Sequence, residues 1–156
     1  MTRGLIATLC LFLIACGGAS AEDHLTASQE AMAAGDYAKA LVETETGLGL
    51  SPDDKTRWRL ELAGLEAMAR AGNEQTATKI EALASAEGTP VKCSHYVSTA
   101  DQLKAASQGP QAITMLDAGL KRFPDCDDAK KAIEQSKATA DDSEKSMLES
   151  LGYLGE

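Results

Sequence analysis

The stretch Gly35–Pro52, GDYAKALVETETGLGLSP, decides the fold class of this chain. A similar stretch, GPQAITMLDAGLKRFP, follows at Gly109–Pro124. An offset of 72 residues brings small and helix-breaking positions of the two stretches into register: Ala40 with Ala112, Gly47 with Gly119, and Pro52 with Pro124. An internal repeat of this spacing indicates an array of repeated supersecondary units.

The composition favours helices and argues against two classes of partner. The chain has 156 residues, which is enough for one domain with a single core. Only 4% of its residues are aromatic and alanine is abundant, which favours closely packed helices over a β-sandwich. The formal net charge of −9 argues against nucleic acid and against an anionic membrane surface, since both need clustered lysine and arginine.

Apolar and small residues recur at helical spacing between the breaking positions. In the first unit, Leu25, Ser28 and Met32 share one helix face, and Gly35-Asp36 ends that helix and caps the next. A single helix pair cannot bury its apolar face alone, so several pairs must stack. The sequence therefore predicts an all-α fold of antiparallel helix-turn-helix pairs.

These units resemble tetratricopeptide repeats, whose period of about 34 residues is close to half of the offset. The resemblance covers 21–128 and implies a short solenoid of about three repeats, with 127–138 as a capping helix. The first repeat is divergent, because His24 and Thr44 stand where the family has large residues. The residues that carry the resemblance are small residues at helix crossings, aromatic residues and closing prolines: Ser28, Ala40, Gly47, Pro52, Trp58, Tyr96, Ala100, Ala112, Gly119 and Pro124.

In tetratricopeptide repeats, the first helix of each repeat lines a concave groove that receives an extended peptide or a partner helix. The resemblance implies the same groove here, and with it protein–protein interaction without catalysis. The alternative for each groove residue is a solvated or core-facing side chain. By position, the implied groove residues are Leu25, Gln29, Met32, Arg59, Val97, Asp101 and Lys104.

The first residues predict export from a bacterial cytoplasm. Arg3 supplies a positive charge, and Leu5–Ala15 is an apolar run too short to span a bilayer. Leu13-Ile14-Ala15-Cys16 resembles a bacterial lipobox, which implies a signal peptide over 1–15, cleavage before Cys16 and a membrane anchor of acyl chains on that residue. Because Gly17 replaces the aspartate that usually marks inner-membrane retention, the resemblance points to the outer membrane, facing the periplasm.

A different cleavage site remains open. Ala19-Ser20-Ala21 is an A-x-A site, and cleavage there would release a soluble periplasmic module that binds a peptide or another ligand. With the lipobox, four segments follow: signal peptide 1–15, flexible tether 16–22, helical domain 23–140 and amphipathic C-terminal tail 141–156. In the tail, Met147, Leu151 and Leu154 share one helical face. This face either folds back onto the domain, docks a partner or occupies the groove of the protein itself.

Two cysteines, Cys93 and Cys126, lie beyond the lipobox. An exported compartment favours a disulfide between them, and the alternative is two free buried thiols. A metal site of Cys93, His95 and Cys126, in an envelope sensor or enzyme, is a third hypothesis that lacks paired Cys-x-x-Cys spacing and a fourth ligand. No catalytic motif accompanies His24 or His95. We expect no catalytic residue, no metal and no cofactor, and an envelope protein or peptide as partner.

Overall fold

The computed structural model describes residues 18–155, so the predicted signal peptide 1–15 and lipidation site Cys16 lie outside the described residues. Over that range the chain is all-helical, as predicted, with no strand. None of these helices combines the length and the apolar character needed to cross a membrane. The helices are α1 (Ala21–Ala33), α2 (Tyr37–Gly49), α3 (Asp54–Arg70), α4 (Thr76–Ser85), α5 (Cys93–Ala105), α6 (Gly109–Arg122), α7 (Asp127–Thr139) and α8 (Asp142–Ser150).

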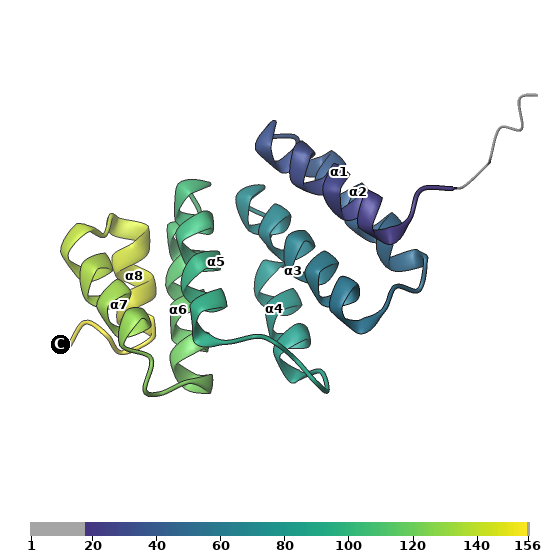
Figure 1. Ribbon diagram of the computed structural model, residues 1–156. Coiled ribbons are helices and arrows are strands. Elements are labelled where there is room, and N and C mark those ends of the chain that lie inside the picture. The colour runs from purple at the N-terminus through teal and green to yellow at the C-terminus, as the bar shows by residue number, and fades with distance from the viewer. Residues whose placement is uncertain (1–17, 156) are drawn as a thin grey trace, which may run out of the picture.

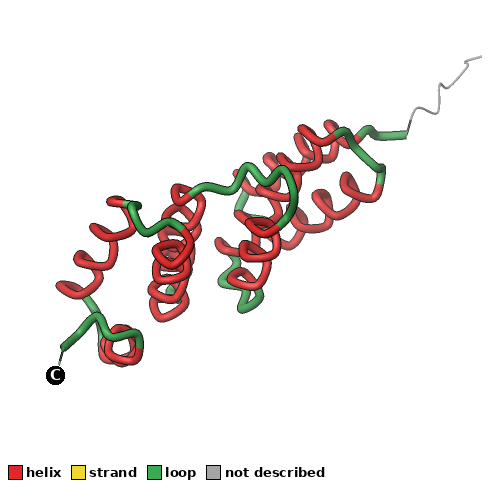
Figure 2. Tube along the Cα trace, turned by 90° about the horizontal axis from the view of Figure 1, so that it is seen from below, coloured by secondary structure: helices red, strands yellow, loops and turns green. Residues whose placement is uncertain are grey.

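Adjacent helices pack in pairs, and the pairs are stacked in chain order (Figure 1). Helix α1 packs against α2 and α5 against α6, while α1, α3, α5 and α7 are successive neighbours along the array. Figure 2 shows the same elongated array from below, with α1 near one end and the C-terminus at the other. Any segment that precedes α1 therefore joins the array at the end opposite the C-terminus.

Capping residues fix where the helices begin. Asp36 and Asp53 are the N-caps of α2 and α3, and their carboxylates accept hydrogen bonds from the N–H groups of Lys39 (3.0 Å) and Thr56 (2.8 Å). Pro110 stands in the first turn of α6, where no N–H is needed. Asp36 thus has the cap role predicted for it, and Asp53 and Pro110 have corresponding roles at the starts of α3 and α6.

The two similar stretches occupy equivalent places in the packing. Gly47 and Gly119 lie where the second helix of a pair approaches the first. A Cβ at Gly119 would lie 2.8 Å from the Cβ of Tyr96, and one at Gly47 would lie 3.1 Å from the Cβ of His24. Since His24 and Tyr96 are also 72 residues apart, the sequence repeat is a repeat of helix-crossing geometry.

The two alanines of the repeat lie at crossings without room for larger side chains, since Ala40 is 0% and Ala112 is 4% exposed. We expect Ala40→Leu and Ala112→Leu each to lower the free energy of unfolding by about 1–3 kcal/mol, because added methylenes overpack a filled core. Urea denaturation measures this. Ala38→Leu, on the exposed side of α2, is the matched control and should change stability by less than about 0.5 kcal/mol. Unchanged midpoints in both buried variants would contradict this packing.

Buried apolar side chains form a large cluster over α3 to α8 and a small one at α1, α2 and α3. The small cluster consists of Ala31, Ala40 and Ala67, and partly buried Met32 and Leu41 pack against it. Trp58 is only partly buried, at the edge of the large cluster. The other residues that carry the repeat pattern divide into buried Ser28, Tyr96 and Ala100, partly buried Pro52 and exposed Pro124.

The second helix pair departs from the others. Helix α3 has 17 residues, whereas α1 and α5 have 13, and α4 has only 10. The extra length moves the start of α4 about one turn further along α3. Helix α4 packs on α6, and α6 on α8, but α2 and α4 are not closely packed. A cleft therefore remains between α2 and α4.

The segment predicted as a tail, 141–156, is part of the packed array over its described residues. Helix α8 packs against α6 and α7, and its Leu148 is 0% exposed. The segment therefore folds back onto the helical domain, which is one of the alternatives that the sequence left open. The fully buried residue is Leu148, whereas Met147, Leu151 and Leu154 of the predicted face are partly buried.

The sulfur atoms of Cys93 and Cys126 lie at disulfide distance, with their Cα atoms 6.3 Å apart. Cys93 is the first residue of α5 and Cys126 is the N-cap of α7. The bridge therefore joins the starts of two neighbouring helices and encloses α6 between them.

Candidate functional site

A groove runs across α1, α3 and α5, and we name it the odd-helix groove. Three adjoining hollows of about 310, 330 and 450 Å³ form it. The hollows share lining residues, which makes them one continuous surface feature. The shared residues are Gln29, Met32, Tyr37, Glu66, Arg70, Ser98 and Gln102.

Four of the seven residues assigned to a groove from sequence line this one: Gln29, Met32, Arg59 and Asp101. Val97 is partly buried against the large core cluster, and Lys104 is exposed but does not line the hollows. Leu25 is 1% exposed, so it is a core residue and is not available to a partner. The prediction that Leu25 lines the groove is therefore wrong. Leu25 lies on the same helix face as Ser28, which is also buried.

Sequence reasoning missed several residues of the groove, among them Glu66, Arg70, Ser98 and Gln102. The spacing of these residues in the sequence indicates that they share a helix face. Leu62, Glu66 and Arg70 recur every four residues on α3, and Ser98 and Gln102 do so on α5, which places each set along one side of its helix. The signal is weak because polar side chains at such spacing also occur on ordinary solvated faces.

Three charged side chains of the groove, Arg59, Glu66 and Arg70, are paired with neighbours, whereas Asp101 forms no ion pair within residues 18–155. The guanidinium of Arg59 donates to both carboxylate oxygens of Glu22 on α1, at 2.6 and 2.9 Å. Arg70 Nε donates to Glu66 Oε1 at 2.9 Å, and this hydrogen bond raises the pKa of Arg70 above its ordinary value. Such exposed pairs stabilise by only about 0–1 kcal/mol each. Their main consequence is that both guanidinium groups of the groove are compensated, which leaves the carboxylate of Asp101 as its uncompensated charge.

Neutral polar groups lie between these ion pairs. Gln29 lines the groove from α1, and Ser98 and Gln102 line it from α5. His95 Nδ1 accepts a hydrogen bond from the N–H of Lys92 at 2.9 Å, so a neutral His95 ring carries its proton on Nε2 and can donate from there. Amide, hydroxyl and imidazole groups can satisfy both the N–H and the C=O of an extended peptide backbone.

The residues of the metal hypothesis do not form a metal site. The thiols of Cys93 and Cys126 are joined to each other, and a disulfide offers no thiolate to a metal. Within residues 18–155, no group of three or more histidine, cysteine, aspartate or glutamate side chains is placed to hold an ion. The other histidine, His24, bonds through Nδ1 to Glu43 Oε2 at 2.7 Å and links α1 to α2.

Comparisons with protein-family models, with curated proteins and with solved structures give no match for this chain. What the protein does is therefore inferred from its own residues.

Proposed function

We propose that this protein is an exported, lipid-anchored scaffold of the bacterial cell envelope that binds another protein through the odd-helix groove. The observation that carries the proposal is the groove itself, lined by the first helices of three successive pairs. This is the face that tetratricopeptide repeats use for peptides and helices. We also propose a tetratricopeptide-like solenoid as the finer description of the fold, supported by the close helix approaches at Gly47 and Gly119.

The chemistry of the groove favours a peptide segment over a small charged ligand. Met32 and Leu62 offer apolar contact, and Gln29, Ser98 and Gln102 offer neutral hydrogen-bonding groups. Because Arg59 and Arg70 are already paired with carboxylates, a strongly anionic ligand would have to displace those partners. A partner segment that presents backbone groups and apolar side chains fits this surface without breaking an ion pair.

The start of α1 favours cleavage before Cys16 over cleavage after Ala21. Ser20 is the N-cap of α1: its hydroxyl accepts from the N–H of Asp23 at 3.2 Å, and its own N–H donates to the Asp23 carboxylate at 2.8 Å. The second of these bonds lowers the pKa of Asp23. Cleavage after Ala21 would remove the cap and place a positive amine at a helix N-terminus, which is unfavourable. The soluble module produced by this cleavage would therefore begin with a helix that has lost its N-cap, Ser20.

The position of α1 suits a tethered scaffold. Because helix α1 begins at Ala21, residues 21 and 22 of the predicted tether are helical. An anchor on Cys16 would then hold the end of the array that carries α1 near the membrane, and α7 and α8 would lie furthest from it (Figure 1). The groove residues on α1, α3 and α5 would face proteins of the same membrane or of the periplasm next to it.

Site-specific photocrosslinking in the native envelope tests the groove. We expect a photoreactive phenylalanine derivative in place of Gln102 or of Gln29 to capture one and the same protein after irradiation. The same derivative in place of Thr46, on the exposed side of α2, is the matched control and should not capture it. Equal capture from all three positions, or none from the two groove positions, would contradict a binding role for this surface.

A further inference from the structure

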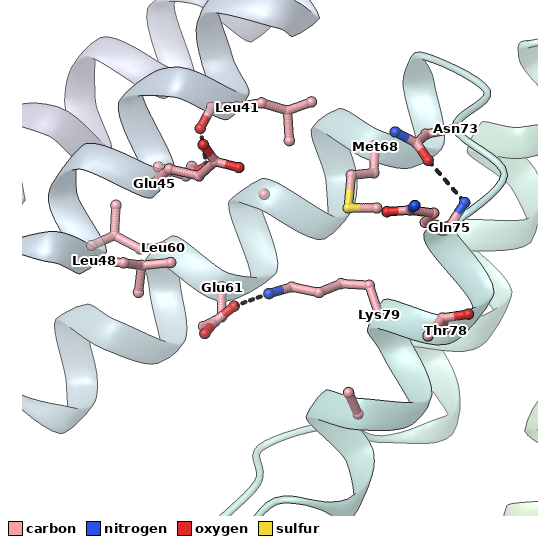
Figure 3. A pocket seen from close by; sticks show the side chains of 13 residues that line it. Leu41, Glu45, Leu48, Leu60, Glu61, Met68, Asn73, Gln75, Thr78 and Lys79 are labelled. Atoms are coloured by element: carbon pink, nitrogen blue, oxygen red, sulfur yellow. Dashed lines mark hydrogen bonds and ion pairs between the residues drawn. The ribbon is translucent and has the colours of Figure 1, made fainter.

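A second hollow, of about 600 Å³, lies where α2 and α4 are not closely packed, and we name it the α2–α4 cleft (Figure 3). Its lining comes from α2, α3, α4 and the turn between α3 and α4, and does not overlap with that of the odd-helix groove. The volume lies within the range of about 300–1,000 Å³ that is usual for ligand pockets. The cleft is therefore a separate candidate site.

The cleft results from the unequal way in which α2 and α4 pack on α3. Helix α2 lies close to α3 at Gly64, where a Cβ would be 3.2 Å from Thr44 Oγ1. Helix α4 begins only at Thr76, because α3 continues to Arg70. The next even-numbered helices do pack directly, α4 on α6 and α6 on α8. Of the neighbouring even-numbered helices α2, α4, α6 and α8, the pair α2 and α4 is therefore the one that is not closely packed.

The lining has an apolar interior and an acidic rim. Leu41, Leu48 and Met68 are partly buried and supply the accessible apolar surface, while Leu60, which is 0% exposed, lies beneath it. At the rim, Lys79 Nζ lies 2.5 Å from Glu61 Oε2, and this ion pair bridges α3 and α4 (Figure 3).

The remaining rim carboxylate is Glu45. It is exposed and forms no ion pair within residues 18–155. Since Lys79 and Glu61 compensate each other, the rim carries one uncompensated negative charge, on a chain whose net charge is −9.

We propose that the α2–α4 cleft binds an amphipathic helix with a basic polar face, supplied by a partner protein. The two walls run from Leu41 to Leu48 and from Gln75 to Ala82, each about 10 Å or two helical turns long. Apolar side chains at i, i+3 or i+4, and i+7 of a docked helix reach the interior over that length. A lysine or arginine next to these apolar side chains of the docked helix lies close to Glu45. This charge complementarity favours a helix with a basic polar face.

The methionines of the chain allow a direct test. Met68 lies in the α2–α4 cleft, Met32 in the odd-helix groove, and Met115 is 0% exposed in the core. The mature protein, labelled with carbon-13 at the methionine methyl groups, is titrated with a leucine–lysine peptide of about 18 residues patterned as an amphipathic helix. We expect the Met68 resonance to move in a saturable way while the Met32 and Met115 resonances stay in place.

Charge variants separate recognition from general attraction to an acidic protein. Glu45→Lys should weaken binding of the peptide by about tenfold, since it replaces an attractive charge by a repulsive one. Glu30→Lys, at an exposed site on α1, is the matched control and should change affinity by less than about twofold. Equal weakening in the two variants would mean bulk charge attraction and would overturn the proposal.

Three further outcomes would overturn it. The Met68 resonance could stay fixed at about millimolar peptide, it could move with protein concentration alone, or the Met32 resonance could move in its place. The second outcome would identify a second copy of the chain as the occupant. The third would leave the odd-helix groove as the binding surface, so the two proposals fail in distinguishable ways.

Discussion

Reduction of the Cys93–Cys126 disulfide is expected to lower the free energy of unfolding by about 3–4 kcal/mol. The two cysteines are 33 residues apart, and closing a loop of that length removes conformational entropy from the unfolded chain. In the folded chain, the bridge ties the first residue of α5 to the N-cap of α7. Urea denaturation at equilibrium, with and without reductant, measures the difference.

The double variant Cys93→Ala/Cys126→Ala is the control for effects of the reductant itself. It should unfold at the same low urea concentration whether or not reductant is present. Since Cys126 makes no side-chain hydrogen bond as N-cap, the alanine at that position removes the bridge without removing a cap. Coincident denaturation curves for the oxidised and reduced wild-type chain would contradict a stabilising disulfide.

Shortening the side chain of Leu148 is expected to have an effect of similar size. Leu148→Ala should lower the free energy of unfolding by about 2–5 kcal/mol, because Leu148 is 0% exposed and its loss leaves a cavity in the large core cluster. Tyr153 holds the same segment by donating a hydrogen bond from its hydroxyl to Asp117 Oδ1 at 3.1 Å. Burial, together with this carboxylate, raises the pKa of the Tyr153 hydroxyl.

Leu154→Ala provides the matched comparison for Leu148→Ala. Leu154 is partly buried and lies beyond the end of α8, so its truncation should cost clearly less than that of Leu148. Thermal unfolding of the two variants, followed by circular dichroism, ranks the two residues. A larger loss for Leu154→Ala would contradict the assignment of Leu148 as the main anchor of the C-terminal segment.

The repeat and its turns could be predicted from the sequence because they depend on local chemistry. Asp36 and Asp53 are good N-caps wherever a helix can follow them, and Pro110 suits a first helical turn. The equivalence of Gly47 and Gly119 is visible in the sequence as a spacing, and the missing Cβ at each position permits a close helix approach. These features need no knowledge of distant contacts.

What could not be predicted depends on where the helices end and on which neighbour each face meets. Met147, Leu151 and Leu154 of the predicted C-terminal face do pack against the large core cluster, but they do not belong to one helix, because α8 ends at Ser150 and Gly152 turns the chain at a φ of 80°. Leu25 was assigned to the groove by position in a repeat, but it packs into the core. The α2–α4 cleft had no local signal, since it results from the added turn of α3 and the late start of α4.

The proposed lipid anchor would decide which proteins the odd-helix groove can reach. The intact mass of the mature protein from a membrane fraction tests this proposal most directly. The proposed function predicts a chain that begins at Cys16 and carries three acyl chains, with the Ser20 cap of α1 retained. An unmodified chain that begins at Glu22, recovered from the soluble periplasmic fraction, would contradict the anchored scaffold and would identify a diffusible binding protein.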